Sequence, residues 1–98
     1  MATDVAGNGL LFPFGQLVAT PGALDALDRN HAGVWTYLSR HLTGDWGDLD
    51  AEDQAENELS LREGFRLLSA YALRDGTRIW IITEADRSVT TVLLPAEY

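Results

Sequence analysis

Short apolar segments in the second half of the chain predict an antiparallel sheet. Residues 78–83 are rich in Ile and Trp, and residues 89–94 are rich in Val, Thr and Leu. Both segments favour a pleated, half-buried surface because many of their side chains are β-branched or aromatic. A third apolar segment, residues 65–73, precedes them. Because only short polar turns separate the three segments, we expect them to form an antiparallel β-meander.

The turn between the segments 65–73 and 78–83 sets the expected pairing of these two strands. Residues 74–77 have the sequence Arg-Asp-Gly-Thr, and Asp-Gly at the centre of a two-residue loop is a strong hairpin signal. With Asp-Gly as the loop, Tyr71 lies opposite Trp80. The sheet face that carries Ile79 and Ile81 is then smooth and apolar, and we expect the helices to pack on it. A shift of one residue in the pairing would exchange the two faces.

A helix is predicted to begin at Pro21 and to end before the segment 30–33, Asn-His-Ala-Gly. Thr20 can cap this helix, and Pro21 suits its first position because the N–H that proline lacks would have no helical partner there. We expect the helix to end at about Asp28. Its inward side chains are predicted to be Leu24 and Leu27.

Two more helices are predicted before the meander. The first covers residues 34–42, and its inward face has helical spacing. That face comprises Val34, Leu38, His41 and Leu42. The second covers residues 51–63, with Asp50 as N-cap and Gly64 as C-cap. Its apolar stripe is thin and consists of Ala51, Ala55 and Leu59.

The order of these elements predicts an α+β fold, with two or three short helices packed on a three- to four-stranded antiparallel β-meander. Residues 16–19 could add a short strand. We assign residues 11–98 to a single domain, because this length suits one hydrophobic core. Residues 1–10 contain two glycines and no periodicity, and we expect them to form a flexible tail.

The charge of the chain limits the classes of partner. Fifteen acidic residues face seven basic residues, all of them arginine, and the net charge is −8. A phosphate-binding surface needs positive charge, so direct nucleic-acid binding is not expected. The acidic chain instead favours a protein partner with a basic surface.

The cellular location is predicted from composition and hydropathy. The chain contains no cysteine, which excludes disulfides and thiolate metal sites and suits a reducing cytoplasm. No apolar run approaches the ~18 residues of a membrane span, and residues 1–10 lack the features of a signal peptide. We therefore expect a cytoplasmic protein without a membrane segment, and we assign it no cofactor and no metal ligand.

An acidic segment, residues 45–58, carries much of the negative charge. It contains seven acids and no base. Such a run could occupy a basic groove on a partner, although a solvated helix face is the simpler explanation, because charged helix faces are usually just exposed. Trp46 lies between two glycines in this segment and is the best candidate of the three tryptophans for an exposed anchor, with a core position left as an equal alternative, whereas Trp35 and Trp80 are expected to be mainly core. The predicted binding residues are Asp45, Trp46, Asp48, Asp53 and Glu56.

Two polar sets offer an alternative, enzymatic interpretation. His41, Asp45 and Asp48 have spacings that could surround a divalent ion or form a base and its orienting acid, although loop aspartates are commonly turn residues. In the second set, His41 or Glu84 would serve as general base, and Arg66 or Arg87 would bind a phosphate. This set predicts a small hydrolase or nuclease.

Several sequence blocks together resemble a known family. Residues 14–24 read FGQLVATPGAL, residues 44–48 read GDWGD after Arg-His at 40–41, residues 68–71 read LSAY, and residues 80–91 read WIITEADRSVTT before LLP at 93–95. From about residue 14 to residue 98, the chain resembles short uncharacterised bacterial proteins of chromosomes and mobile elements. Members carry labels such as hypothetical, plasmid-related or type I restriction subunit M.

The restriction-subunit label of some members does not fit the residues of this chain. Such a subunit needs a cofactor-binding α/β domain with a Gly-rich strand-to-helix turn, which these 98 residues do not contain. We therefore expect a protein-binding module, regulatory or anti-defence, that uses the acidic surface. The alternative rests on analogy of fold alone, because helices followed by an antiparallel sheet also describe barnase- and RelE-like ribonucleases.

Overall fold

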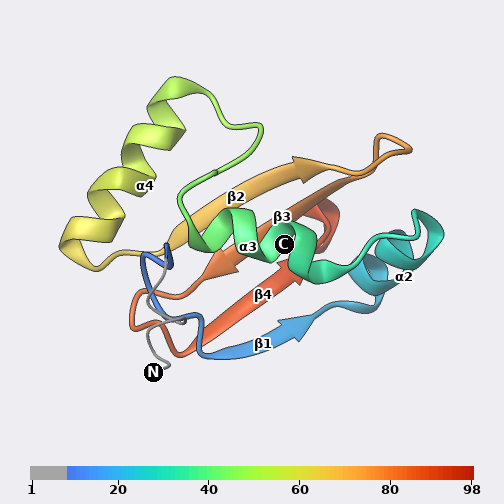
Figure 1. Cartoon of the computed structure of the whole chain (residues 1–98), viewed down its shortest axis with the longest axis horizontal. Helices are drawn as coiled ribbons and strands as arrows, with labels where there is room; N and C mark the ends of the chain where they lie inside the picture. Colours follow the sequence, from blue (N-terminus) through green and yellow to red (C-terminus); the bar gives the residue numbers. More distant parts are fainter. Residues whose placement is uncertain (1–8) are drawn as a thin grey trace.

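The computed structural model describes residues 9–98, so most of the predicted N-terminal tail lies outside the described residues. A four-stranded sheet is combined with helices on one face and beyond one edge (Figure 1). In chain order the elements are β1 (Gln16–Ala19), α2 (Pro21–Arg29), α3 (Val34–Leu42), α4 (Ala51–Glu63), β2 (Leu67–Ala72), β3 (Arg78–Thr83), β4 (Val89–Leu93) and the 3₁₀ turn η1 (Pro95–Glu97). None of the helices in this part of the chain is long and apolar enough to cross a membrane.

The predicted helices are confirmed, and their ends follow from local chemistry. The side chain of Thr20 accepts a hydrogen bond from the backbone of Ala23 and caps α2, and Asp50 caps α4 in the same way. Gly64 ends α4 in the left-handed conformation, with φ of 80°. One inward residue of α2 was predicted wrongly, because Leu24 is 55% exposed. The buried side of α2 consists of Ala23, Ala26 and Leu27.

The sheet is mixed, which corrects the prediction of a purely antiparallel meander. Its strand order is β1-β4-β3-β2, and β1 pairs parallel with β4 while the other pairs are antiparallel. The local pattern indicated that residues 16–19 form a strand, but not which strand lies beside it. Parallel pairing needs a long connection, and α2, α3, α4 and two strands provide it.

The β2–β3 hairpin has a different register from the predicted one. Tyr71 pairs with Ile79, and Trp80 pairs with Ala70. The N–H of Leu73 donates to the carbonyl of Thr77, so the loop has three residues instead of two. Gly76, with φ of +91°, takes the left-handed position that such a loop requires. The extra loop residue shifts the register by one, so Tyr71 of β2 shares the helix-facing side with Ile79, and Ala70 lies on the opposite side.

The hydrophobic core lies between the sheet and the helices α2 and α3. Figure 1 shows α3 crossing one face of the sheet, with α2 near one end. The strands bury Leu67, Tyr71, Ile79, Ile81 and Val92 on this face, and the helices contribute Ala23, Ala26, Leu27, Leu38 and Leu42. The expected inward face of α3 is confirmed for Leu38, His41 and Leu42, with Val34 partly buried.

Helix α4 lies beyond the β2 edge of the sheet (Figure 1). The predicted stripe of Ala51, Ala55 and Leu59 is exposed, and the buried residues of α4 are the polar Asn57 and Ser60. The Asn57 amide donates to the carbonyl of Leu68 at 2.7 Å and accepts from its N–H at 3.1 Å. Polar contacts to a strand edge therefore help to hold this helix, which explains why hydrophobic periodicity misplaced its buried face.

The β2 edge is also covered by the chain that enters α4. The N–H of Ala70 donates to the carbonyl of Trp46, and the carbonyl of Ala70 accepts from the N–H of Asp48. Gly47 makes this approach possible, because a Cβ at that position would lie 2.0 Å from the Ala70 oxygen. Covering an edge in this way satisfies backbone groups that could otherwise pair with another chain.

Candidate functional site

A groove of about 700 Å³ lies between α4 and the sheet face opposite α2 and α3. Its lining from β2 and β3 includes Leu68, Ala70 and Trp80, which the observed register places on this face. Asp53 and Glu56 line it from α4. The groove therefore combines an apolar, aromatic sheet surface with an acidic helix wall.

Two carboxylates of this wall have no partner in the part of the chain that the structure describes. The side-chain carboxylates of Asp53 and Glu56 accept no hydrogen bond and join no ion pair among residues 9–98. Asp48, by contrast, lies 3.8 Å from the guanidinium of Arg78, and both residues line the groove. Because no described residue pairs with Asp53 or Glu56, their carboxylates are available to a cationic group entering the groove.

An aromatic and cationic cluster lies beside the floor of the groove. The rings of Trp80 and Tyr98 meet edge to face, with centroids 5.6 Å apart. The guanidinium of Arg66 lies 5.5 Å from the centre of the Tyr98 ring and donates to its hydroxyl. Contacts of this kind show that the aromatic surface here can hold an arginine side chain.

Two of the five predicted binding residues have other roles in the fold. The carboxylate of Asp45 accepts from Nε of Arg40 at 2.7 Å and from the N–H of Gly47. Chiefly through the Arg40 contact, the pKa of Asp45 is lowered. Trp46 is only 3% exposed, so its expected role as an exposed anchor is wrong, and its indole N–H donates to Glu58. Asp48, Asp53 and Glu56 do line the groove.

The other two tryptophans also differ from expectation. Trp35 was expected in the core but is 55% exposed, and it packs edge to face against Phe14. Trp80 is half-buried on the groove side of the sheet. Aromatic character alone could not separate these environments, because tryptophan occurs both in cores and in binding surfaces.

His41 is fully buried and forms the centre of a chain of polar side chains. Its Nδ1 lies 2.6 Å from the hydroxyl of Ser69, and its Nε2 lies 2.9 Å from that of Thr83. Thr83 contacts the hydroxyl of Thr90 at 2.7 Å, and Thr90 donates to the carbonyl of Phe14. The chain ties α3 to β2, β3, β4 and the segment before β1.

The directions of these hydrogen bonds follow from counting protons. A carbonyl can only accept, so the single hydroxyl proton of Thr90 is used on Phe14. Thr83 must then donate to Thr90, and Nε2 of His41 must donate to Thr83. Nδ1 is left as the acceptor for Ser69. The network therefore selects one neutral tautomer of His41. Burial lowers the pKa of this histidine to about 4, and the charge of Arg87 adds to the shift.

The structure does not bring the alternative catalytic set into one accessible site. His41 contacts hydroxyl groups inside the core. Arg87 donates to the carbonyls of Ser60, Phe65 and Glu84, so it connects the end of α4 to the β3–β4 turn. Arg66 is engaged with Tyr98.

The metal interpretation of the acidic loop receives no geometric support. His41 and Asp45 point to different partners, the first to Ser69 and Thr83 and the second to Arg40. Within residues 9–98, no group of three or more histidine, aspartate or glutamate side chains could hold a metal ion. The sequence spacing did not imply convergence because Gly44 turns the chain between them, with φ of +90°.

Sequence reasoning missed the groove because of one hairpin. The predicted register placed Trp80 with Tyr71, whereas the observed register places it with Ala70 and Leu93. A usable signal was present, since a three-residue loop with glycine at its last position is also a common hairpin connection. Choosing that loop would have placed Leu68 and Ala70, instead of Tyr71, beside Trp80 on the face opposite the helices.

Comparison of the chain with protein-family models, with curated proteins and with solved structures finds no match.

Proposed function

We propose that this protein is a cytoplasmic protein-binding module whose groove accepts a basic segment of a partner protein. The observation that carries the proposal is the pair of carboxylates of Asp53 and Glu56, unpaired within residues 9–98, on a groove that Trp80 also lines. A lysine or arginine side chain could lie on the indole while its charge meets these carboxylates. The net charge of −8 would speed the encounter with a basic partner.

The resemblance to proteins of mobile elements suggests the purpose of such binding. A regulatory or anti-defence protein can act by occupying a surface on another protein, without a catalytic set. A basic surface that normally binds nucleic acid is a suitable target, because an acidic groove presents the same sign of charge as a phosphate backbone.

The test compares charge reversals that change the net charge equally. A random peptide library displayed on phage would be selected against the wild type, and selected peptides measured by fluorescence anisotropy. We expect enrichment of arginine and lysine, and a loss of affinity of about tenfold or more in the double variant Asp53→Lys/Glu56→Lys. The matched control is Glu52→Lys/Glu63→Lys, which reverses two acids of α4 outside the groove lining.

A third variant separates the aromatic contribution from charge. Trp80→Leu keeps an apolar side chain on the sheet but removes the aromatic face, so it should weaken binding while leaving its salt dependence largely unchanged. Equal affinity in the groove variant and its charge-matched control would mean that binding is only general attraction to an acidic protein, and the proposal would be abandoned.

A further inference from the structure

The two edges of the sheet differ in whether other residues of the chain bond to their outward backbone groups. At the β2 edge, Leu68 is bonded by the Asn57 amide and Ala70 by the chain around Gly47. At the other edge, β1 pairs only with β4, and no described residue lies on its outer side as a strand. Proteins commonly protect open edges, because the free backbone groups there can pair with another strand.

The outward backbone groups of β1 belong to Leu17 and Ala19. The N–H of Gln16 donates to the carbonyl of Ser88, directly before β4, and the N–H of Thr20 donates to the carbonyl of Val92 within β4. Bonding direction alternates along a strand, so Leu17 and Ala19 direct their N–H and C=O groups away from β4. No described side chain or backbone group bonds to either residue at that edge.

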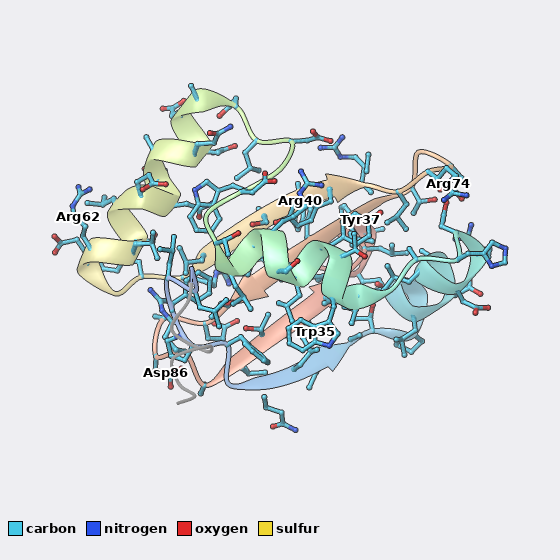
Figure 2. The ribbon with its side chains drawn as sticks, in the orientation of Figure 1. Trp35, Tyr37, Arg40, Arg62, Arg74 and Asp86 are labelled. Atoms are coloured by element: carbon cyan, nitrogen blue, oxygen red, sulfur yellow. The ribbon has the colours of Figure 1, made fainter. Side chains whose placement is uncertain are left out.

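β1 carries no charged side chain, and exposed apolar side chains lie on and beside it. β1 has the sequence Gln-Leu-Val-Ala, without a charge. Val18 is 38% exposed. On the helix side, Trp35 is 55% exposed, and Figure 2 shows it between α3 and β1, where it contacts Phe14. The strand carries none of the charged or proline residues that commonly prevent edge pairing.

From these observations we infer that β1 pairs antiparallel with β1 of a second copy of this chain, forming a continuous eight-stranded sheet. A two-fold axis at Val18 places Leu17 opposite Ala19 of the other copy, and the exchange of their N–H and C=O groups forms about four hydrogen bonds. A neutral, self-complementary strand selects an identical strand, because it offers no charge by which a basic partner would be recognised.

The charge distribution permits this pairing despite the net charge of −8. The acidic helix α4 lies beyond β2, at the opposite edge from β1 (Figure 1). In the dimer the two β2 strands would be about 34 Å apart, at about 4.8 Å per strand spacing. This separation is several times the Debye length of about 8 Å at physiological salt. The carboxylate of Glu97, close to the end of β1, is occupied by Thr20, Gly22 and Leu94.

The first test measures mass and amide exchange of the full chain as a function of concentration. Sedimentation should show the mass rising from 10.8 kDa towards twice that value. The amides of Leu17 and Ala19 should become protected from hydrogen exchange over the same concentration range, while that of Val18, which faces β4, is protected throughout. A monomer at every concentration would overturn the inference. So would protection of these two amides that does not depend on concentration, because residues of the same chain would then cover the edge.

The second test uses substitutions that act on the edge itself. Val18→Lys places a charge beside the partner strand, and Ala19→Pro removes an outward N–H that bonds to no residue of 9–98 in the monomer. Each of these two substitutions should weaken dimerisation by at least about tenfold, since the two-fold axis places the changed residue in the interface twice. Val18→Thr, which keeps the β-branched shape, should leave the dimer intact. A dimer that survives both edge substitutions, in variants with wild-type circular dichroism, would contradict the β1 pairing.

Discussion

The substitution Thr83→Val would remove the central hydroxyl of the buried polar chain around His41. This hydroxyl accepts from Nε2 of His41 and donates to Thr90. Valine has nearly the same shape, so the change leaves no large cavity. It does leave the imidazole N–H without an acceptor in a site with no exposed surface. An unsatisfied buried donor costs about 1–3 kcal/mol, and we expect a loss of stability in this range.

The assay is urea and thermal unfolding followed by circular dichroism. For a domain of this size, 1 kcal/mol corresponds to a fall in Tm of about 4–8 °C, so the effect is well above the measurement error. Thr91→Val is the matched control, because Thr91 is a half-buried threonine on the same strand as Thr90 and its hydroxyl bonds to no described residue. This control should change stability by less than about 0.5 kcal/mol.

A spectroscopic measurement tests the direction of the hydrogen bonds independently of stability. The ¹⁵N chemical shifts of His41 should show a neutral ring with the proton on Nε2. The conservative variant Thr83→Ser keeps the hydroxyl and should keep this tautomer. Equal stability of Thr83→Val and Thr91→Val, or a proton on Nδ1 in the wild type, would refute the reasoning.

Three further predictions concern pH, the α4 contact and two left-handed glycines. Because burial lowers the pKa of His41 from 6.5 to about 4, the unfolded chain binds more protons between these values. Stability should therefore fall by on the order of 3 kcal/mol as pH drops from 6.5 to 4 and level off below, and urea titrations of His41→Gln should lack this slope. Asn57→Ala should lower the free energy of unfolding by about 1–3 kcal/mol and speed hydrogen exchange of the Leu68 amide. Exchange of this amide at the wild-type rate would contradict the role of Asn57. Gly64→Ala, with nothing within 4 Å of the new Cβ, should cost about 1–2 kcal/mol in thermal unfolding. Gly47→Ala should cost clearly more, because its Cβ meets the Ala70 oxygen, and equal losses would disprove the steric argument.

The chain's elements could be predicted because local chemistry decides them. Thr20, Asp50 and Gly64 mark helix ends through bonds or dihedral angles within a few residues. The strands of the meander were recognisable from β-branched and aromatic side chains. The α+β class followed from the order of these elements, and the acidic character of the 45–58 segment was evident from its composition.

The candidate groove could be predicted only in part. Asp48, Asp53 and Glu56 were named from charge, and all three line it. The apolar floor beside Trp80 was missed because one additional loop residue changes which side chains of β2 share a face with it. Trp46 was expected at the surface, yet the Glu58 carboxylate satisfies its N–H in a buried position.

Local sequence thus determined which segments are helices and strands, where they begin and end, and where negative charge gathers. Tertiary structure alone decided that β1 lies beside β4, that polar contacts hold α4 to the β2 edge, and that His41 is enclosed by hydroxyl groups. The physical reason is the distance along the chain over which each interaction acts. Caps and turns involve neighbouring residues, whereas strand order, burial and the pairing of polar side chains depend on residues far apart in the sequence.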